Sequence, residues 1–272
     1  MKKLHLVYFS PSGSTEKIVR TVASGIEGLP VETIDLLTSA SRKKHYTFGP
    51  NDIVIFGMMT AGKLFTLSDE IFACLEGNDI PFIGVVTYGN TYYGIALKEL
   101  LQRATNSGFK VAAMAAFVAS HSMDYSIATG RPDAKDMDII ADFGRRAFEK
   151  VKCGDFTLHT QPVTSSTDWE MGRKVVAYRE EHPDEPYALP SDCKAKAISD
   201  DCIKCCTCVR HCPVDAIDIE AKTFDLDKCI GCWGCINRCP KHAITSTSRQ
   251  VAEIMRSIGE AATARLEPDI LF

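Results

Sequence analysis

Residues 4–27, LHLVYFSPSGSTEKIVRTVASGIE, predict a strand, a short turn and a helix in succession. Leu4–Phe9 is a short apolar run, which is typical of a strand buried on both faces of a parallel sheet. Apolar residues of the segment Ser14–Glu27 then recur at helical spacing, at Ile18, Val19, Val22 and Ile26. The turn between them, Ser10–Thr15, has the sequence SPSGST and is rich in hydroxyl groups.

The same alternation continues through residue 151. Four further apolar runs bounded by turn residues predict strands at Val31–Leu36, Asp52–Gly57, Phe82–Thr87 and Val111–Val118. Helical periodicity fills gaps between or after them, at Leu67–Leu75, Ile95–Ala104 and Asp136–Val151. Five strand-and-helix repeats indicate an α/β fold with a doubly wound five-stranded parallel sheet, whose ligands bind beyond the carboxyl ends of the strands.

The turn Ser10–Thr15 is suited to holding a phosphate group. Backbone N–H groups and the helix dipole would supply a positive field, and the hydroxyl groups would donate hydrogen bonds. The turn contains no Lys or Arg, so the charge of a bound phosphate would stay largely uncompensated. Neither a Gly-x-Gly-x-x-Gly pattern nor a Walker lysine is present, which disfavours a dinucleotide site and a P-loop. A plain helix N-terminus without a ligand is the alternative.

Beyond the first half, the chain of 272 residues divides into three more segments. Residues 152–198 are rich in proline and predict a connector with one helix, capped by Thr167 and Glu170 and ending near His182. Residues 199–246 hold eight of the 12 cysteines. Residues 247–272 predict a helix entered through Thr247 and Gln250, followed by a tail; its apolar stripe must pack on another part of the protein.

The cysteine-rich segment is an internal duplication. CIKCCTCVRHCP (202–213) and CIGCWGCINRCP (229–240) superpose at a fixed offset, with four cysteines and a proline in register. Three closely spaced thiolates per string suit one face of a cube of four irons and four sulfides. A pair of Cys₄ zinc sites is the alternative, but zinc ribbons do not use the third and fourth cysteines at this spacing. Cys206, Cys74, Cys153 and Cys193 lack partners at motif spacing and are expected to be structural.

This spacing, C-x-x-C-x-x-C-x-x-x-C-P twice over, resembles that of bacterial two-cluster ferredoxins. The resemblance implies a small α+β domain with two [4Fe-4S] clusters, in which the fourth cysteine of each string ligates the other cluster. It assigns Cys202, Cys205, Cys208 and Cys239 to one cluster and Cys229, Cys232, Cys235 and Cys212 to the second.

The turn Ser10–Thr15 resembles the phosphate fingerprint of flavodoxins, and two further loops lie where flavodoxins hold the isoalloxazine ring of FMN. The resemblance implies a flavodoxin-like FMN-binding domain over residues 1–151, with Tyr92 or Tyr93 favoured over Tyr88 as the ring partner. The FMN contacts that it implies are Ser10, Ser12, Gly13, Ser14, Thr15, Met59, Thr60, Ala61, Gly62, Thr87, Tyr88, Gly89, Asn90, Tyr92, Tyr93 and Gly94. Tyrosines at such a loop also serve as core edge or interface.

Taken together, the two modules resemble the flavodoxin–ferredoxin fusion proteins of anaerobes, over residues 1–151 and 199–246. Related proteins have an aromatic residue in the loop after the third strand, where this chain has Thr60 between Met58–Met59 and Ala61. That departure leaves one face of the ring to be covered by methionine, by another domain, or by a substrate.

Composition excludes several other classes of protein. Apolar residues make up 45% and charged residues 24%, which is ordinary for a globular chain. Residues 1–151 carry 16 basic and 16 acidic side chains, and residues 199–246 carry six and seven, so no basic surface for nucleic acid is expected. Since no run of 18 apolar residues and no signal-peptide core are present, we expect a cytoplasmic protein without a membrane partner.

A flavin joined to two cubanes predicts an electron carrier that couples one-electron clusters to FMN, with redox proteins as donors or acceptors. Two alternatives remain open. One is an FMN-dependent reductase of a small organic acceptor such as a quinone or a nitro compound; the other is an iron–sulfur redox sensor. The sequence identifies no general acid or base, and it leaves open whether a homodimer brings one subunit's clusters to the other's flavin.

Overall fold

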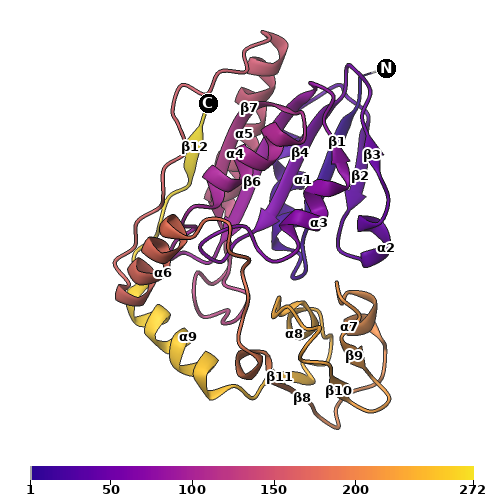
Figure 1. The fold of residues 1–272 in the computed structure, drawn as a ribbon, viewed down its shortest axis with the longest axis vertical. Helices are drawn as coiled ribbons and strands as arrows, with labels where there is room; N and C mark the ends of the chain where they lie inside the picture. The colour runs from indigo at the N-terminus through magenta and orange to yellow at the C-terminus, as the bar shows by residue number, and fades with distance from the viewer. Residues whose placement is uncertain (1) are drawn as a thin grey trace.

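The computed structural model describes residues 2–272, and its N-terminal half is built on a parallel sheet (Figure 1). The five parallel strands are β1 (Leu4–Phe9), β2 (Val31–Asp35), β4 (Ile53–Met59), β6 (Pro81–Tyr88) and β7 (Lys110–Val118). Their order, β2-β1-β4-β6-β7, is that of a flavodoxin-like doubly wound sheet. The five predicted strands are confirmed, with ends that differ by no more than two residues.

A sixth strand, β12 (Asp269–Leu271), pairs antiparallel with β7 and completes the sheet. The prediction of a purely parallel five-stranded sheet is therefore incomplete, because the C-terminal tail returns to the first domain. The tail is too short to show a strand period in the sequence, and it forms a strand because β7 offers it an unpaired edge.

Helices cover both faces of the sheet. The helices α1 (Ser14–Ser24) and α5 (Ala134–Lys152) pack on one face, and α3 (Ser68–Ala73) and α4 (Ala96–Asn106) pack on the other. The start of α5 carries a capping box formed by Asp133 and Asp136. Three short elements lie at the edge beyond β2 and α3, namely α2 (Ser39–Arg42), β3 (Tyr46–Thr47) and β5 (Leu75–Glu76).

The connector contains α6 (Glu170–Glu181), a 3₁₀ turn η1 (Ser191–Lys194) and β8 (Lys196–Ile198). The predicted capping box of α6 is wrong. Trp169 is the N-cap residue, and the Thr167 hydroxyl accepts a hydrogen bond from the Trp169 N–H at 3.2 Å, one residue before the helix begins. Glu170 instead pairs with Lys174 on the helix surface.

The cysteine-rich segment folds into two similar halves. The first contains α7 (Thr207–Arg210), β9 (Ile217–Asp218) and β10 (Thr223–Phe224), and the second contains α8 (Gly234–Asn237) and β11 (Ile244–Ser246). Strand β11 pairs antiparallel with β8, so residues 196–198 of the connector are part of this small domain. A small α+β domain is what the ferredoxin resemblance implied.

The C-terminal helix α9 (Arg249–Ala261) lies below α6 and runs toward β8 and β11 of the cluster domain (Figure 1). Its N-cap is Ser248, whose hydroxyl accepts a hydrogen bond from the Val251 N–H, one residue later than the predicted entry at Thr247. Val251, Met255 and Ile258 of the predicted apolar stripe are buried. Among residues 2–272, no helix is both long and apolar enough to cross a bilayer.

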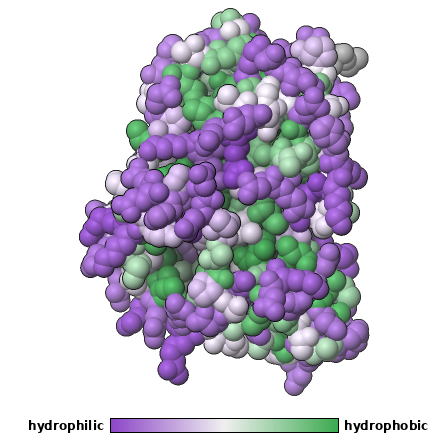
Figure 2. Space-filling view, viewed as in Figure 1, coloured by the Kyte–Doolittle hydropathy of each residue, from purple (hydrophilic) through white to green (hydrophobic). Residues whose placement is uncertain are grey.

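The cluster domain sits opposite the carboxyl ends of β1, β4, β6 and β7 (Figure 1). Apolar side chains gather at the level where it meets the first domain (Figure 2). The fold therefore places the cysteine-rich segment, α6 and α9 around the sheet edge at which ligands of doubly wound folds bind.

Candidate functional site

The loop between β1 and α1 forms a cradle of hydrogen-bond donors. Gly13 adopts a left-handed conformation (φ 95°) as the N-cap residue of α1 and provides no side-chain cap. The Ser10 hydroxyl accepts from the Glu16 N–H at 3.0 Å, which holds the loop closed. Among residues 2–272, the N–H groups of residues 12–15 have no hydrogen-bond acceptor. This cluster of free donors at a helix N-terminus fits a phosphate group.

Two further loops, after β4 and after β6, are fixed against each other and against α1. The Thr60 N–H donates to the Thr87 carbonyl at 3.0 Å, and the hydroxyl groups of Thr15 and Thr87 lie 2.8 Å apart. A Cβ atom at Gly94 would lie 2.0 Å from the Gly62 carbonyl oxygen, and Gly94 has a φ of 59°. Glycine is required at this position because the two loops meet backbone to backbone.

The three loops line a cavity of about 480 Å³, a size ordinary for cofactor pockets. Eleven of the residues predicted to contact FMN line it: Ser12, Ser14, Thr15, Met59, Thr60, Ala61, Gly62, Thr87, Tyr88, Gly89 and Tyr92. Ser10, Gly13 and Gly94 do not line the cavity but shape the loops described above. The site thus joins a donor cradle for a phosphate to a largely apolar chamber that fits a flat ring.

Asn90 and Tyr93 lie outside the cavity and serve the fold. The Asn90 amide donates to the Ala264 carbonyl at 2.8 Å, and its oxygen accepts from the Leu266 N–H at 3.1 Å. Tyr93 is 1% exposed and packs in the core, edge-on to Tyr88. Of the two favoured ring partners, Tyr92 alone faces the cavity, together with Tyr88.

The far side of the cavity is built from segments outside the first domain. Helix α6 contributes Met171, Val175 and Arg179, and the connector adds Tyr187 and Leu189. Helix α9 contributes apolar side chains from Val251 to Ile258. These residues were not identified as site residues from the sequence, although the amphipathic stripe of α9 indicated that it packs on something. Side chains of α6 and α9 therefore line the same cavity as Thr60.

His121 is a cavity residue held in one tautomer. Its Nδ1 accepts a hydrogen bond from the Met123 N–H at 3.2 Å, so a neutral ring carries its hydrogen on Nε2. Burial lowers the pKa of His121 to about 4. The ring is therefore neutral at pH 7 and presents no positive charge to the cavity.

This burial predicts a pH-dependent stability. An exposed histidine titrates near 6.5, so the unfolded chain binds more protons than the folded chain between pH 4 and 6.5. The contribution of the buried, neutral His121 ring to the stability of the fold is present in full above pH 6.5 and is lost as the pH falls. Between pH 7 and pH 5 the wild type is expected to lose about 2 kcal/mol more stability than a His121→Gln variant. Thermal unfolding of both proteins at each pH measures this difference, and equal losses would contradict it.

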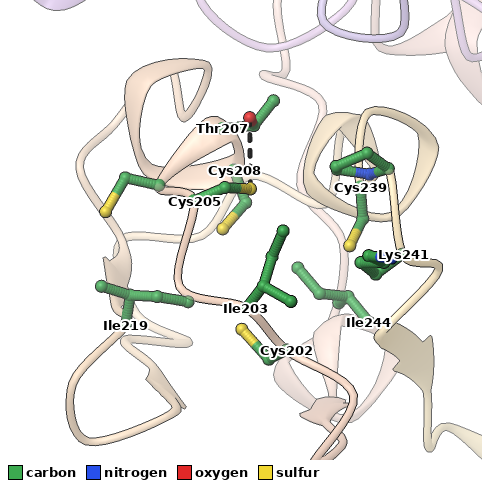
Figure 3. Close-up of a pocket in the computed structure, with 11 residues that line it drawn as sticks. Cys202, Ile203, Cys205, Thr207, Cys208, Ile219, Cys239, Lys241 and Ile244 are labelled. Atoms are coloured by element: carbon green, nitrogen blue, oxygen red, sulfur yellow. Dashed lines mark hydrogen bonds between the residues drawn. The ribbon is translucent and has the colours of Figure 1, made fainter.

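The eight cysteines of the repeated pattern lie in two groups of four. Cys202, Cys205, Cys208 and Cys239 line one small pocket (Figure 3). Cys212, Cys229, Cys232 and Cys235 line another. Each group joins three cysteines of one string to the fourth cysteine of the other, which is the grouping that the ferredoxin resemblance implied. Cys206 also lines the first pocket, with its sulfur 3.4 Å from the Lys204 carbonyl.

Matching backbone donors point at equivalent sulfurs in the two halves. The Ala216 N–H donates to Cys212 Sγ at 3.2 Å, and the Ala243 N–H donates to Cys239 Sγ at 3.3 Å. Burial raises the pKa of Cys232 and that of Cys235 to about 12, so these thiols ionise only with a strong positive partner. Sulfurs grouped in fours and supplied with N–H donors fit iron–sulfur ligation.

The second group of cysteines lies against the cavity. Gly231, between Cys229 and Cys232, lines it, and Cys232 packs with the core of the first domain. A Cβ atom at Gly234 would lie 2.9 Å from the Pro11 carbonyl oxygen, so glycine permits the close approach of α8 to the donor loop. In the first group, by contrast, Cys205 is exposed.

Comparison with known families decides the nature of this segment. A family model described as a 4Fe-4S binding domain matches residues 195–218 and 222–245. Residues 195–245 are therefore similar to a 4Fe-4S binding domain, in two successive segments. Each half of the duplication matches separately, and the first match includes β8 from the connector. A comparison with curated proteins finds no match.

Comparison with solved structures finds flavodoxins and related proteins. A flavodoxin from the domain Archaea matches at 20% identity and a TM-score of 0.39, over 56% of this chain and 99% of that one. A flavodoxin, WrbA-like protein from Agrobacterium tumefaciens matches at 18% identity and 0.37, with the same two coverages. A putative flavoprotein from Bacteroides uniformis matches at 14% identity and 0.32, over 46% of this chain and 94% of that one.

Proposed function

We propose that this chain is an electron-transfer protein that holds FMN and two [4Fe-4S] clusters and passes electrons between them within one molecule. The proposal rests on one observation. The donor loop Ser10–Thr15 forms part of one cavity, and Gly231 of the second cysteine string lines the same cavity. A flavin in that cavity and a cluster on Cys229, Cys232, Cys235 and Cys212 would be neighbours.

FMN supplies a centre that accepts one or two electrons, and each cluster supplies a one-electron centre. The residues of the chain bind and shield these groups. The free N–H groups of residues 12–15 would hold the phosphate, while Tyr88 and Tyr92 would contact the ring. Helices α6 and α9 line the far side of the chamber, where apolar side chains would reduce the contact of a bound ring with water.

The position of the two cysteine groups supports an order for electron transfer between the centres, although Cys208 of the first group is as buried as Cys232. Cys232 is 8% exposed and packs against the first domain, whereas Cys205 is exposed and Ile203 beside it is 60% exposed. We therefore propose that the Cys202, Cys205, Cys208 and Cys239 cluster exchanges electrons with partner proteins. The cluster on Cys212, Cys229, Cys232 and Cys235 would connect it to the flavin site.

Rapid mixing of anaerobic, FMN-loaded protein with dithionite tests this order. The clusters and the flavin are followed by their separate absorbance bands. We expect the flavin to bleach after the clusters, with a first-order rate constant that does not change when the protein is diluted tenfold. A flavin that stays oxidised would contradict the proposal, and a rate proportional to protein concentration would show transfer between chains instead.

The size of the cavity also favours a second candidate function, the reduction of a small organic acceptor. The cavity of about 480 Å³ reaches from the three loops to α6 and α9, so a small molecule could share the chamber with the ring. Reoxidation of reduced protein by a small quinone discriminates between the two. A rate that saturates with quinone concentration, and falls when Val175→Trp fills the chamber, supports the reductase. A linear rate unaffected by Val175→Trp supports the carrier.

A further inference from the structure

Arg238 reaches from the cluster domain onto the donor loop of the first domain. It follows α8 and lies between Cys235 and Cys239, which belong to different cysteine groups. Its Nε donates to the Pro11 carbonyl at 2.6 Å, and its Nη2 donates to the Ser10 carbonyl at 3.0 Å. Beside it, the Asn237 amide donates to the Ser122 carbonyl at 3.0 Å. The cluster domain thus grips the loop that would hold the FMN phosphate.

These two hydrogen bonds fix the direction of a loop donor. The Pro11 carbonyl and the Ser12 N–H belong to one planar trans peptide, in which they point in opposite directions. Holding the carbonyl toward Arg238 therefore holds the Ser12 N–H toward the opposite side of that peptide. In an isolated first domain, the two carbonyl groups would turn to water and the loop would lose this constraint.

Arg238 also brings a charge that the loop lacks. Residues 10–15 contain no Lys or Arg, and the first charged residue of α1 is Glu16. The guanidinium Nη2 lies 3.8 Å from the place where a Cβ atom on Gly13 would stand. A fixed arginine at this distance places a guanidinium group beside the phosphate cradle.

The internal duplication shows that the cysteine pattern does not require arginine at this position. His211 stands at the equivalent place in the first half, where its Nδ1 contacts the Thr207 carbonyl of its own half at 2.8 Å. No hydrogen bond joins residues 202–218 to the donor loop, although the Arg42 guanidinium donates to the Pro213 carbonyl. The contacts of Arg238 across the domain interface explain why arginine occupies this position in the second half and not in the first.

We propose that Arg238 makes FMN binding depend on the docked cluster domain, by positioning the phosphate loop and by compensating the phosphate charge. This inference rests on the proposed function of the cavity as an FMN site. By linkage, bound FMN then stabilises the docked cluster domain to the same extent. Arg238 is a positioning residue, and the chain would retain its flavin most tightly once the cluster domain is assembled.

Flavin binding, measured by quenching of flavin fluorescence under anaerobic conditions, tests the proposal without reference to activity. FMN is compared with riboflavin, which has the same ring and no phosphate. In Arg238→Ala we expect FMN to bind at least tenfold more weakly, or about 1.4 kcal/mol, and riboflavin to bind within about twofold of the wild type. Arg238→Lys keeps the positive charge but not the paired hydrogen bonds, so its affinity for FMN should lie between those of the wild type and Arg238→Ala.

Two further variants keep the test decisive. Arg210→Ala removes an exposed arginine at the other cysteine group and should leave both affinities unchanged. Arg238→His installs the residue of the equivalent position and is used if Arg238→Ala loses iron. Unchanged FMN affinity in an iron-replete Arg238 variant overturns the inference, as does an equal loss for riboflavin. A wild type that binds neither flavin would instead refute the proposed function.

Discussion

A chain in which Cys232 is replaced by serine is expected to hold about four iron atoms instead of about eight. Cys232 lies in the cysteine group that borders the cavity and packs against the first domain. Losing that cluster would interrupt the proposed route between the exposed cysteine group and the flavin site. Flavin reduction through the clusters is expected to slow by at least a hundredfold, an effect of about 2.7 kcal/mol on the barrier.

The matched control is Cys206→Ser, which replaces a cysteine outside the repeated pattern. It should keep about eight iron atoms and wild-type flavin reduction, because its equivalent in the second half is Trp233, which ligates nothing. Iron loss in Cys206→Ser equal to that in Cys232→Ser would refute the assignment of ligands. Unchanged flavin reduction in a Cys232→Ser chain that has lost the cluster would refute the order of centres.

Replacing Gly94 by alanine is expected to disrupt the cavity and lower the stability of the first domain by about 2–4 kcal/mol. Its Cβ atom would lie 2.0 Å from the Gly62 carbonyl oxygen, and the φ of 59° adds strain to any larger residue. The loops after β4 and β6 would then separate, and FMN binding should weaken by at least tenfold. Thermal unfolding and flavin fluorescence measure the two effects.

Gly130→Ala is the control for the backbone contribution. Gly130 has a φ of 77°, but a Cβ atom there would meet nothing within 4 Å. Gly130→Ala should lower the stability of the first domain by about 1 kcal/mol and leave flavin binding unchanged. If Gly94→Ala is no more destabilising than Gly130→Ala, the close contact between the two loops does not shape the cavity as described.

The sheet and the cysteine groups were predictable because their signals lie within short stretches of sequence. A strand buried on both faces must be apolar throughout, so runs such as Leu4–Phe9 and Val111–Val118 mark it without knowledge of its neighbours. The cysteine pattern is similarly local. The donor loop followed from hydroxyl groups placed between a strand and a helix.

The cavity's far wall was not predictable, because it depends on surfaces that meet only in the folded chain. The stripe of α9 indicated a helix with one buried face, but the sequence does not say that this face covers a cavity. Asn90 and Tyr93 lie in a loop rich in polar and aromatic residues. In such a loop, residues that contact a cofactor and residues that pack in the core are of the same types, so the sequence does not distinguish the two roles. Asn90 forms hydrogen bonds with Ala264 and Leu266 of the C-terminal tail, and the sequence around Asn90 does not predict these partners.

Arg238 illustrates the same limit at the level of charge. The sequence predicted a phosphate left largely uncompensated, because Ser10–Thr15 contains no cation. The structure brings a guanidinium to that loop from a residue more than 200 positions later. Local composition therefore described the loop correctly and the electrostatic environment of the site incompletely.

Quantitation of iron, acid-labile sulfide and flavin in one anaerobic preparation measures whether one chain holds both kinds of redox centre. We expect about eight iron atoms, about eight sulfides and about one FMN per chain. Zinc in place of iron, or a colourless first domain that does not take up added FMN, would contradict this expectation.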